Sequence, residues 1–225
     1  MKHIRLLILG ITAAALFAAQ EINAKITPIV ISEVFYDSPL NENNTLNQAH
    51  HNGEFIELFN PTLSDVKLDG WTLRDKATSF KFPANTTIPA RSNIVVAYRY
   101  PNSNFSLKNL FPQLNQSSEK FILYQSTIQL NNSREYVELI DNNGVLVDRM
   151  SYTHKSNFES YNGYWDICAR NGDYAKNNVG GLVSIQRKDI HTSSAGVTPL
   201  MSDYFTGTPT PMTQSQAVSS LPTLK

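Results

Sequence analysis

The stretch GEFIELFNPTLSDVKLDGWTLRD, residues 53–75, decides the fold. Its first part alternates along a strand, with Ile56 and Leu58 on one face. The other face carries Phe55, Glu57 and Phe59. An Asn-Pro pair at 60–61 and an Asp-Gly pair at 69–70 are turn signals, and the second leads directly into Trp71. The stretch predicts short β-strands joined by tight turns, with the tryptophan as a core anchor.

The same period of two recurs along the chain. We expect about ten short strands, separated by turn clusters, and one short helical turn near 107–111. An Asn143-Gly144 pair suits the positive φ angles of a tight hairpin. This pattern favours an antiparallel sandwich or barrel. The strands are expected within 28–37, 53–60, 64–68, 71–75, 78–83, 93–100, 119–125, 134–141, 145–152 and 182–187.

The first 24 residues have the three parts of a secretory signal. Lys2 and Arg5 form a basic head, residues 6–19 are an uncharged apolar run, and Ala24 closes a small-residue cleavage site. The run is short for a membrane span, and no second stretch of spanning length follows. We therefore expect a signal peptide at 1–24, no transmembrane segment after its removal, and a mature chain that is secreted, periplasmic or at the cell surface.

Charge and cysteine content argue against nucleic-acid binding and against a cysteine nucleophile. The 19 basic and 19 acidic side chains cancel, so a basic face for a nucleic-acid backbone is not expected. Cys168 is the single cysteine, which leaves no internal disulfide, and a lone cysteine is more often a small buried residue than a nucleophile. We expect one domain at 25–205 and a Pro-, Ser- and Thr-rich tail at 206–225.

Several fragments in the order VISEVFYD, GEFIELFNPT, VKLDGWTLRD, FKFPANTTIPARSNIVVA and YVELIDNNGVLVDRMSY resemble the lamin tail domain family. The chain looks like a bacterial, secreted member. The resemblance is best over 29–152, and a last strand is expected near 182–187. The motif positions are Glu57, Leu58, Asn60, Gly70, Trp71, Leu73, Phe82, Pro83, Pro89, Asp141, Gly144 and Asp148.

The resemblance implies an all-β, immunoglobulin-like antiparallel β-sandwich. Residues 38–52 and 153–181 break the strand pattern and are expected to be two long loop insertions, the first of which departs from lamin tails. It implies no catalytic motif and no cofactor, so we do not expect an enzyme. Glu57, Asn60, Gly70 and Trp71 are expected to be structural. Asn60 would stabilise its turn, and Glu57 would pair across the strand with a Lys or Arg.

Candidate metal chemistry is weak. His50 and His51 are adjacent, but no ligand spacing typical of a zinc site accompanies them. The DNNG segment lacks most of the oxygens that calcium needs, although a calcium site at a loop end stays open. No metal site is therefore predicted.

The best candidate surface is residues 158–174, where aromatic rings alternate with small polar residues as in binding loops. Its binding residues would be Tyr161, Tyr164, Trp165 and Tyr174. We expect a protein-interaction or adhesion module whose partner is an envelope or extracellular protein. Two alternatives stay open: a carbohydrate-binding module that uses these rings on a glycan, and a metal-dependent hydrolase with an unrecognised site.

Overall fold

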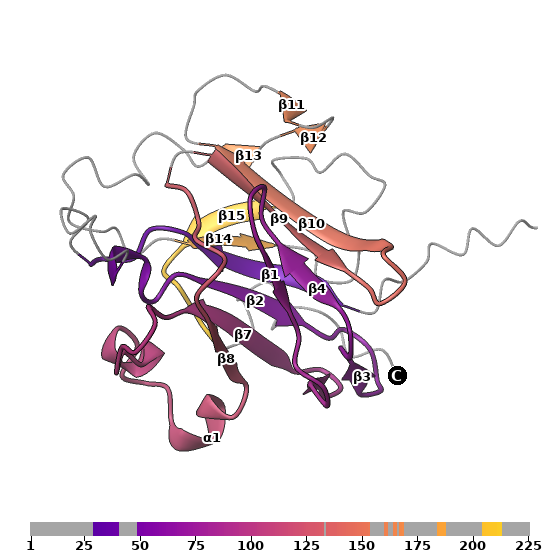
Figure 1. Cartoon of the computed structure of the whole chain (residues 1–225), viewed down its shortest axis with the longest axis horizontal. Coiled ribbons are helices and arrows are strands. Elements are labelled where there is room, and N and C mark those ends of the chain that lie inside the picture. The colour runs from indigo at the N-terminus through magenta and orange to yellow at the C-terminus, as the bar shows by residue number, and fades with distance from the viewer. Residues whose placement is uncertain are drawn as a thin grey trace, which may run out of the picture.

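The structure is a computed structural model that describes residues 29–40, 49–132, 134–153, 160–161, 164–165, 167–168, 184–187 and 204–212. Within these residues nearly all regular structure is strand, in two main sheets that pack face to face (Figure 1). No helix in the described part of the chain is long and apolar enough to cross a membrane. The expected all-β sandwich is confirmed.

The six-stranded sheet has the order β15 (Tyr204–Gly207), β14 (Ser184–Arg187), β1 (Val30–Phe35), β2 (Phe55–Phe59), β7 (Asn93–Tyr98) and β8 (Ile122–Gln125). The five-stranded sheet has the order β13 (Ile167–Cys168), β10 (Leu146–Thr153), β9 (Arg134–Ile140), β4 (Thr72–Arg74) and β5 (Ser79–Lys81). Two small pairs complete the strands: β3 (Val66–Lys67) with β6 (Thr87–Ile88), and β11 (Ser160–Tyr161) with β12 (Tyr164–Trp165).

Helical structure is limited to single turns in the described residues. These are η1 (Ala49–His51), η2 (Leu107–Asn109) and α1 (Gln116–Glu119). The second confirms the turn expected near 107–111. Ser106 caps it by accepting a hydrogen bond from the main-chain N–H of Lys108, and Asn109 bonds back to the main chain of Ser106.

Two strand pairs of the otherwise antiparallel sandwich are parallel. β7 pairs in parallel with β8, and β10 pairs in parallel with β13. Parallel neighbours cannot be joined by a tight hairpin, so a long connection must return the chain to the same edge. Between β7 and β8 this connection contains η2 and α1.

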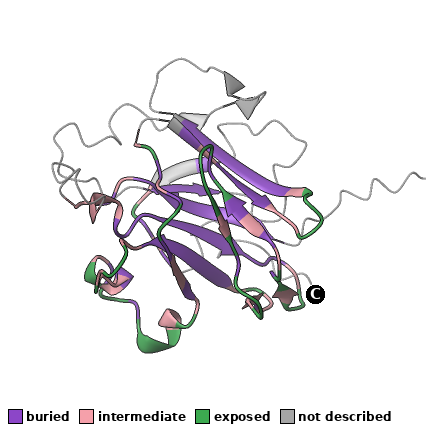
Figure 2. Ribbon diagram, viewed as in Figure 1, coloured by how far each residue is buried: buried purple, intermediate pink, exposed green. Residues whose placement is uncertain are grey.

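The core lies between the sheets and contains Trp71, as expected. Alternation in β2 is also confirmed, because Ile56 and Leu58 belong to this core and Phe55 belongs to a second cluster on the opposite face. That second cluster includes Leu107 and Phe111 from the connection between β7 and β8. The six-stranded sheet is therefore buried on both faces, and all five residues of β2 are buried (Figure 2).

A buried ion pair joins the two sheets. Asp148 of β10 accepts hydrogen bonds at Oδ2 from the main-chain N–H of Ile31 and from Nη2 of Arg187, both at 2.7 Å. The Nε of Arg187 donates in turn to the carbonyl oxygen of Ile31 at 2.9 Å. The contact lies where the β1–β2 register shifts between Ile31 and Glu33, so the pair ties a β-bulge in one sheet to a strand of the other.

The β9–β10 hairpin forms where it was expected, with a different turn. Only Gly144 of the Asn143-Gly144 pair has a positive φ, of 79°. The Asp141 side chain accepts from the main-chain N–H groups of Asn143 and Val145, and a register shift follows between Leu146 and Asp148. A turn followed by one left-handed residue and a bulge is a common longer alternative to the two-residue hairpin.

Candidate functional site

Two glutamates face each other on the outer face of the six-stranded sheet. Glu33 of β1 and Glu57 of β2 are directly opposite in the strand register, and each is only 1% exposed. Sequence reasoning expected Glu57 to face a Lys or Arg, and the structure corrects this. Adjacent like charges are unfavourable on neighbouring strands, so this pair needs a special environment.

Donors from several strands supply that environment. The hydroxyl of Ser184 donates to Glu33 Oε1 at 2.5 Å, and that of Ser32 donates to Glu57 Oε1 at 2.8 Å. The main-chain N–H of Thr210 donates to Glu33 Oε1 at 2.9 Å, and that of Met212 donates to Glu57 Oε2 at 2.7 Å. The Thr210 hydroxyl donates to the remaining Oε2 of Glu33 at 3.1 Å. All four carboxyl oxygens are thus engaged by the chain itself.

Burial raises the pKa of both carboxyl groups above the ordinary value of 4.5. For Glu57, whose pKa is raised further, the second cause is the charge of Glu33. Carboxyl groups with raised pKa values are frequent among catalytic acids. Here residues 208–212 lie over the pair and occupy its oxygens, so the geometry is that of a structural cluster rather than a substrate-accessible acid.

Asn60 stabilises its turn, as expected. Its Oδ1 accepts from the main-chain N–H of Thr62 at 3.0 Å, and its Nδ2 donates to the carbonyl oxygens of Ser64, Ile88 and Pro89. One fully buried amide thus holds the end of β2 against the segment that leads into β7. Gly70 has a φ of 79° at the turn before Trp71, which favours glycine there.

His50 and His51 lie together with ring centroids 4.0 Å apart. Burial, followed by the charge of His50, lowers the pKa of His51 to about 4. His51 is thus neutral near pH 7, and its Nδ1–H donates to Glu54 Oε1 at 2.5 Å in a hydrogen bond. Glu54 Oε2 accepts from the main-chain N–H of Leu130. Within the described ranges, no three His, Cys, Asp or Glu side chains are placed to hold a metal ion.

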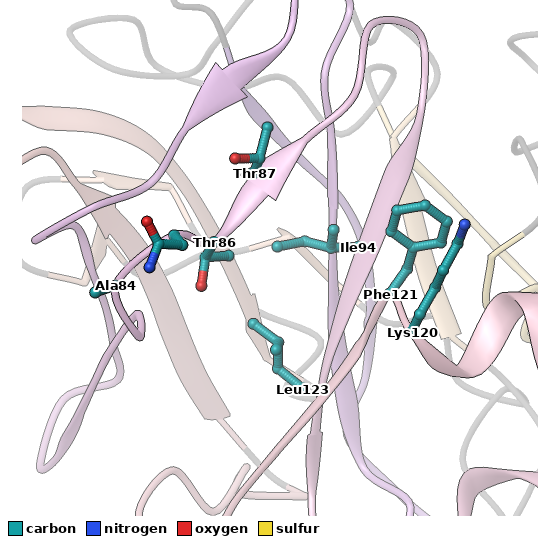
Figure 3. Close-up of a pocket in the computed structure, with 8 residues that line it drawn as sticks. Ala84, Thr86, Thr87, Ile94, Lys120, Phe121 and Leu123 are labelled. Carbon is teal, nitrogen blue, oxygen red and sulfur yellow. The ribbon is translucent and has the colours of Figure 1, made fainter.

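A pocket of about 330 Å³ opens beside β8, the last strand of the six-stranded sheet. Ile94 of β7 and Leu123 of β8 lie between its two walls (Figure 3). Ala84, Thr86 and Thr87 form one wall, and Lys120 and Phe121 form the other. The Lys120 ammonium lies 4.8 Å from the centre of the Phe121 ring. An apolar floor with a few polar groups around it is typical of a ligand-binding pocket.

The structure describes only part of the four aromatic residues that are expected to bind a partner. The backbone of Tyr161, Tyr164 and Trp165 belongs to the β11–β12 pair, in which Tyr161 is opposite Tyr164 and Ser160 is opposite Trp165. Their side chains and the whole of Tyr174 lie outside the described residues.

Sequence reasoning missed both the Glu33–Glu57 pair and the pocket. A single glutamate occurs within a largely apolar strand in VISEVF and again in FIELF, and this recurrence in two strands could have indicated a shared buried position. The pocket had no such signal, because three separate segments form it.

Comparison with known proteins supports the family resemblance. Residues 23–154 match the family model described as Lamin Tail Domain. The comparison with curated proteins gives no match. Among solved structures, a DUF4876 family protein from Bacteroides thetaiotaomicron is similar with a TM-score of 0.42 and 10% sequence identity. That match covers 72% of this chain and 62% of the other, so this chain spans less than two thirds of that protein's length.

Proposed function

The chain belongs to the lamin tail domain family, and from this membership we propose that it is an exported, non-catalytic module that binds an envelope or extracellular protein. The family has an immunoglobulin-like fold, which agrees with the two-sheet sandwich. Export is supported by the basic head and the apolar run of residues 1–24.

The pocket beside β8 is the observation that carries the binding proposal. Phe121 and Leu123 are half-buried apolar residues at the edge of a sheet, and Lys120 is exposed beside them. Interfaces combine an apolar centre with a polar rim, and aromatic residues are enriched at their centres. The partner would fill the pocket with a side chain that has an apolar stem and a hydrogen-bond acceptor at its end. Such a side chain would fit between the two threonines and Lys120.

The Glu33–Glu57 pair supports the absence of catalysis. Among the described residues, these carboxyl groups with raised pKa values are the best candidates for a general acid. Its four oxygens accept hydrogen bonds from the chain, including two from the main chain of residues 208–212. A general acid must reach the proton acceptor of its substrate, and these groups are covered.

A carbohydrate-binding role is the second candidate. It is favoured by the β11–β12 pair, which brings three aromatic positions into a two-stranded hairpin. Glycan-binding sites stack sugars on such rings, and Tyr and Trp contribute large contact areas at low entropic cost.

A pull-down from the envelope fraction of the source organism tests these proposals. The bait is tagged residues 25–225, compared with a pocket variant (Ala84→Trp with Lys120→Glu) and an aromatic variant (Tyr161, Tyr164 and Trp165 to Ala). Lys76→Glu is the matched control, because Lys76 is an exposed lysine that does not line the pocket. Circular dichroism must show that every bait is folded.

We expect a protein that the wild type and the control retain and the pocket variant loses. Loss with the aromatic variant alone would move the contact to the β11–β12 hairpin. If no protein is captured but a glycan array binds the wild type and not the aromatic variant, the carbohydrate role replaces the protein partner. Equal capture by all four baits would refute a specific interaction through either surface.

A further inference from the structure

The strand beside the pocket, β8, is the last strand of the six-stranded sheet. Among the described strands it pairs only with β7, in parallel. The carbonyl oxygen of Phe121 accepts from the N–H of Val95 at 2.9 Å, so the main chain at Phe121 faces β7. Main-chain groups alternate in direction along a paired strand, and those of Ile122 and Tyr124 therefore point away from β7. These groups form an acceptor edge that no described strand occupies.

The acceptor edge has none of the features that usually protect an edge strand. Such strands are commonly blunted by a charged side chain, a proline or a bulge. The sequence of β8 is ILYQ, and its register with β7 is unbroken. By contrast β5, which ends the other sheet beside β4, contains Lys81. The geometry of β8 is thus open to the addition of a further strand.

Side-chain hydrogen bonds hold the acceptor edge in place without a partner. The Tyr124 hydroxyl accepts from the main-chain N–H of Leu107 at 2.8 Å. At the end of β8, Gln125 Oε1 accepts from the N–H groups of Thr127 and Ile128, both at 2.7 Å. An edge that is already ordered loses little conformational freedom when a strand is added, which favours binding.

The pocket lies on one face of this edge. Phe121 and Leu123 line it, whereas the alternate residue Ile122 packs into the cluster on the opposite face of the sheet. Leu123 and Ile94 point toward the threonines of the facing wall (Figure 3). An added strand would have the same alternation, so every second side chain would be directed to the pocket face.

Lys120 gives the pocket its charge preference. It is exposed, and it is the one charged side chain among the described residues that line the pocket. Its neighbour Glu119 pairs with Lys108 at 3.3 Å, and no described carboxylate forms an ion pair with Lys120. The Lys120 ammonium lies 4.8 Å from the centre of the Phe121 ring. A glutamate would lay its apolar stem against Phe121 and bring its carboxylate to Lys120.

We propose that an extended segment of the partner protein adds to β8 as a further strand and places a glutamate side chain in the pocket beside Lys120. This inference names the chemistry of the partner and rests on the proposed protein-binding function. Main-chain bonds to the acceptor edge select an extended segment, and the pocket selects the acidic side chain. The acceptor edge offers the outer groups of only two residues, so both contributions are needed for binding.

Synthetic peptides test the strand addition. The probe is a fluorescently labelled peptide of nine residues in which threonine and valine alternate around a central glutamate, and its binding to residues 25–225 is followed by fluorescence anisotropy. Two N-methylated versions remove alternate main-chain donors, one at every valine and the other at the glutamate and the threonines. A further peptide has lysine in place of the glutamate. The protein variants are Lys120→Glu and, as the matched control, Lys76→Glu.

We expect the glutamate peptide to bind the wild type and the control, and to bind Lys120→Glu at least about fivefold more weakly, because attraction becomes repulsion. The lysine peptide should show the opposite preference. One N-methylated peptide should bind the wild type at least about tenfold more weakly than the other, since only one set of donors faces β8. The set that matters also reports whether the added strand is parallel or antiparallel to β8.

Equal binding of the two N-methylated peptides, or no binding of the glutamate peptide at about 1 mM, would overturn the proposal. The same holds if the charge preference does not reverse in a folded Lys120→Glu variant. The N-methyl comparison uses the wild type alone and decides if circular dichroism shows that this variant is unfolded. Capture of an envelope protein through the pocket without peptide binding would refute strand addition alone. Peptide binding without capture of any envelope protein would refute the proposed partner and leave the strand site standing.

Discussion

Replacing Asp148 by alanine should destabilise the sandwich more than any surface substitution. The carboxylate is fully buried and accepts from the main chain of Ile31 and from Arg187, both at 2.7 Å. Alanine removes both bonds without providing another acceptor. The Arg187 charge, which is 3% exposed, and the Ile31 N–H then remain buried without this partner.

The size of the effect follows from that buried charge. Breaking a buried ion pair by removing one partner costs about 3–5 kcal/mol, whereas replacing both partners by apolar residues is often close to neutral. The free energy of unfolding of a domain of this size is about 5–15 kcal/mol, so Asp148→Ala should lose a large fraction of the stability of the protein. The double variant Asp148→Leu with Arg187→Met should recover much of the loss.

Urea unfolding followed by tryptophan fluorescence measures the four proteins: wild type, Asp148→Ala, Arg187→Met and the Leu/Met double variant. Asp148→Asn is a useful control, because its amide oxygen can still accept from Ile31 while the charge is absent. A loss below about 1 kcal/mol for Asp148→Ala would mean that water or another group satisfies Arg187, and the reasoning from burial would then be refuted.

Three further outcomes are expected. The pKa of Glu57 is raised in the folded state, so the folded chain keeps a proton that the unfolded chain releases above the ordinary pKa of 4.5. The free energy of unfolding should therefore fall as the pH rises above 4.5. Urea titrations at several pH values should show a smaller fall for Glu57→Gln than for the wild type. Asn60→Ala should cost about 1–3 kcal/mol in the same assay, because three carbonyl oxygens lose their common donor. Gly53→Ala should cost more than Gly144→Ala in thermal unfolding, because the new Cβ at residue 53 would lie 2.4 Å from Leu110 Cδ1 and 3.1 Å from Phe105 Cζ, so that both side chains must shift, whereas no atom lies within 4 Å of a Cβ built at Gly144. Equal losses of stability for the two variants would show that the positive φ of each glycine, and not the contact with Leu110, determines the cost of alanine.

Much of the sandwich could be predicted from local pattern. Alternation placed β2, and turn chemistry placed the ends at Asn60 and Gly70, because these signals act over a few residues. The same pattern could not show that both faces of β2 are covered. The covering residues, among them Phe111 and Met212, come from irregular segments far away in the chain.

The site depends on the same long-range information. Cross-strand pairing rules predict an opposite charge beside Glu57, and those rules fail because Glu33 is satisfied by Thr210, which is 177 residues away in sequence. The Pro-rich composition around Thr210 predicted a tail. Composition could not show that the main chain of this segment donates hydrogen bonds to two buried glutamates, because those glutamates lie in strands far away in sequence.

The central position of β1 has a consequence for the order in which the chain folds. β1 pairs with β2 on one side and with β14 on the other, and Arg187 of β14 bonds to Ile31, 156 residues earlier. Contacts between such distant residues form slowly, since a long loop must close before they contribute. β1 therefore gains its second neighbour only after residues 184–187 have been synthesised. Under the proposed export, such a delay would favour the incompletely folded state that a protein export channel requires.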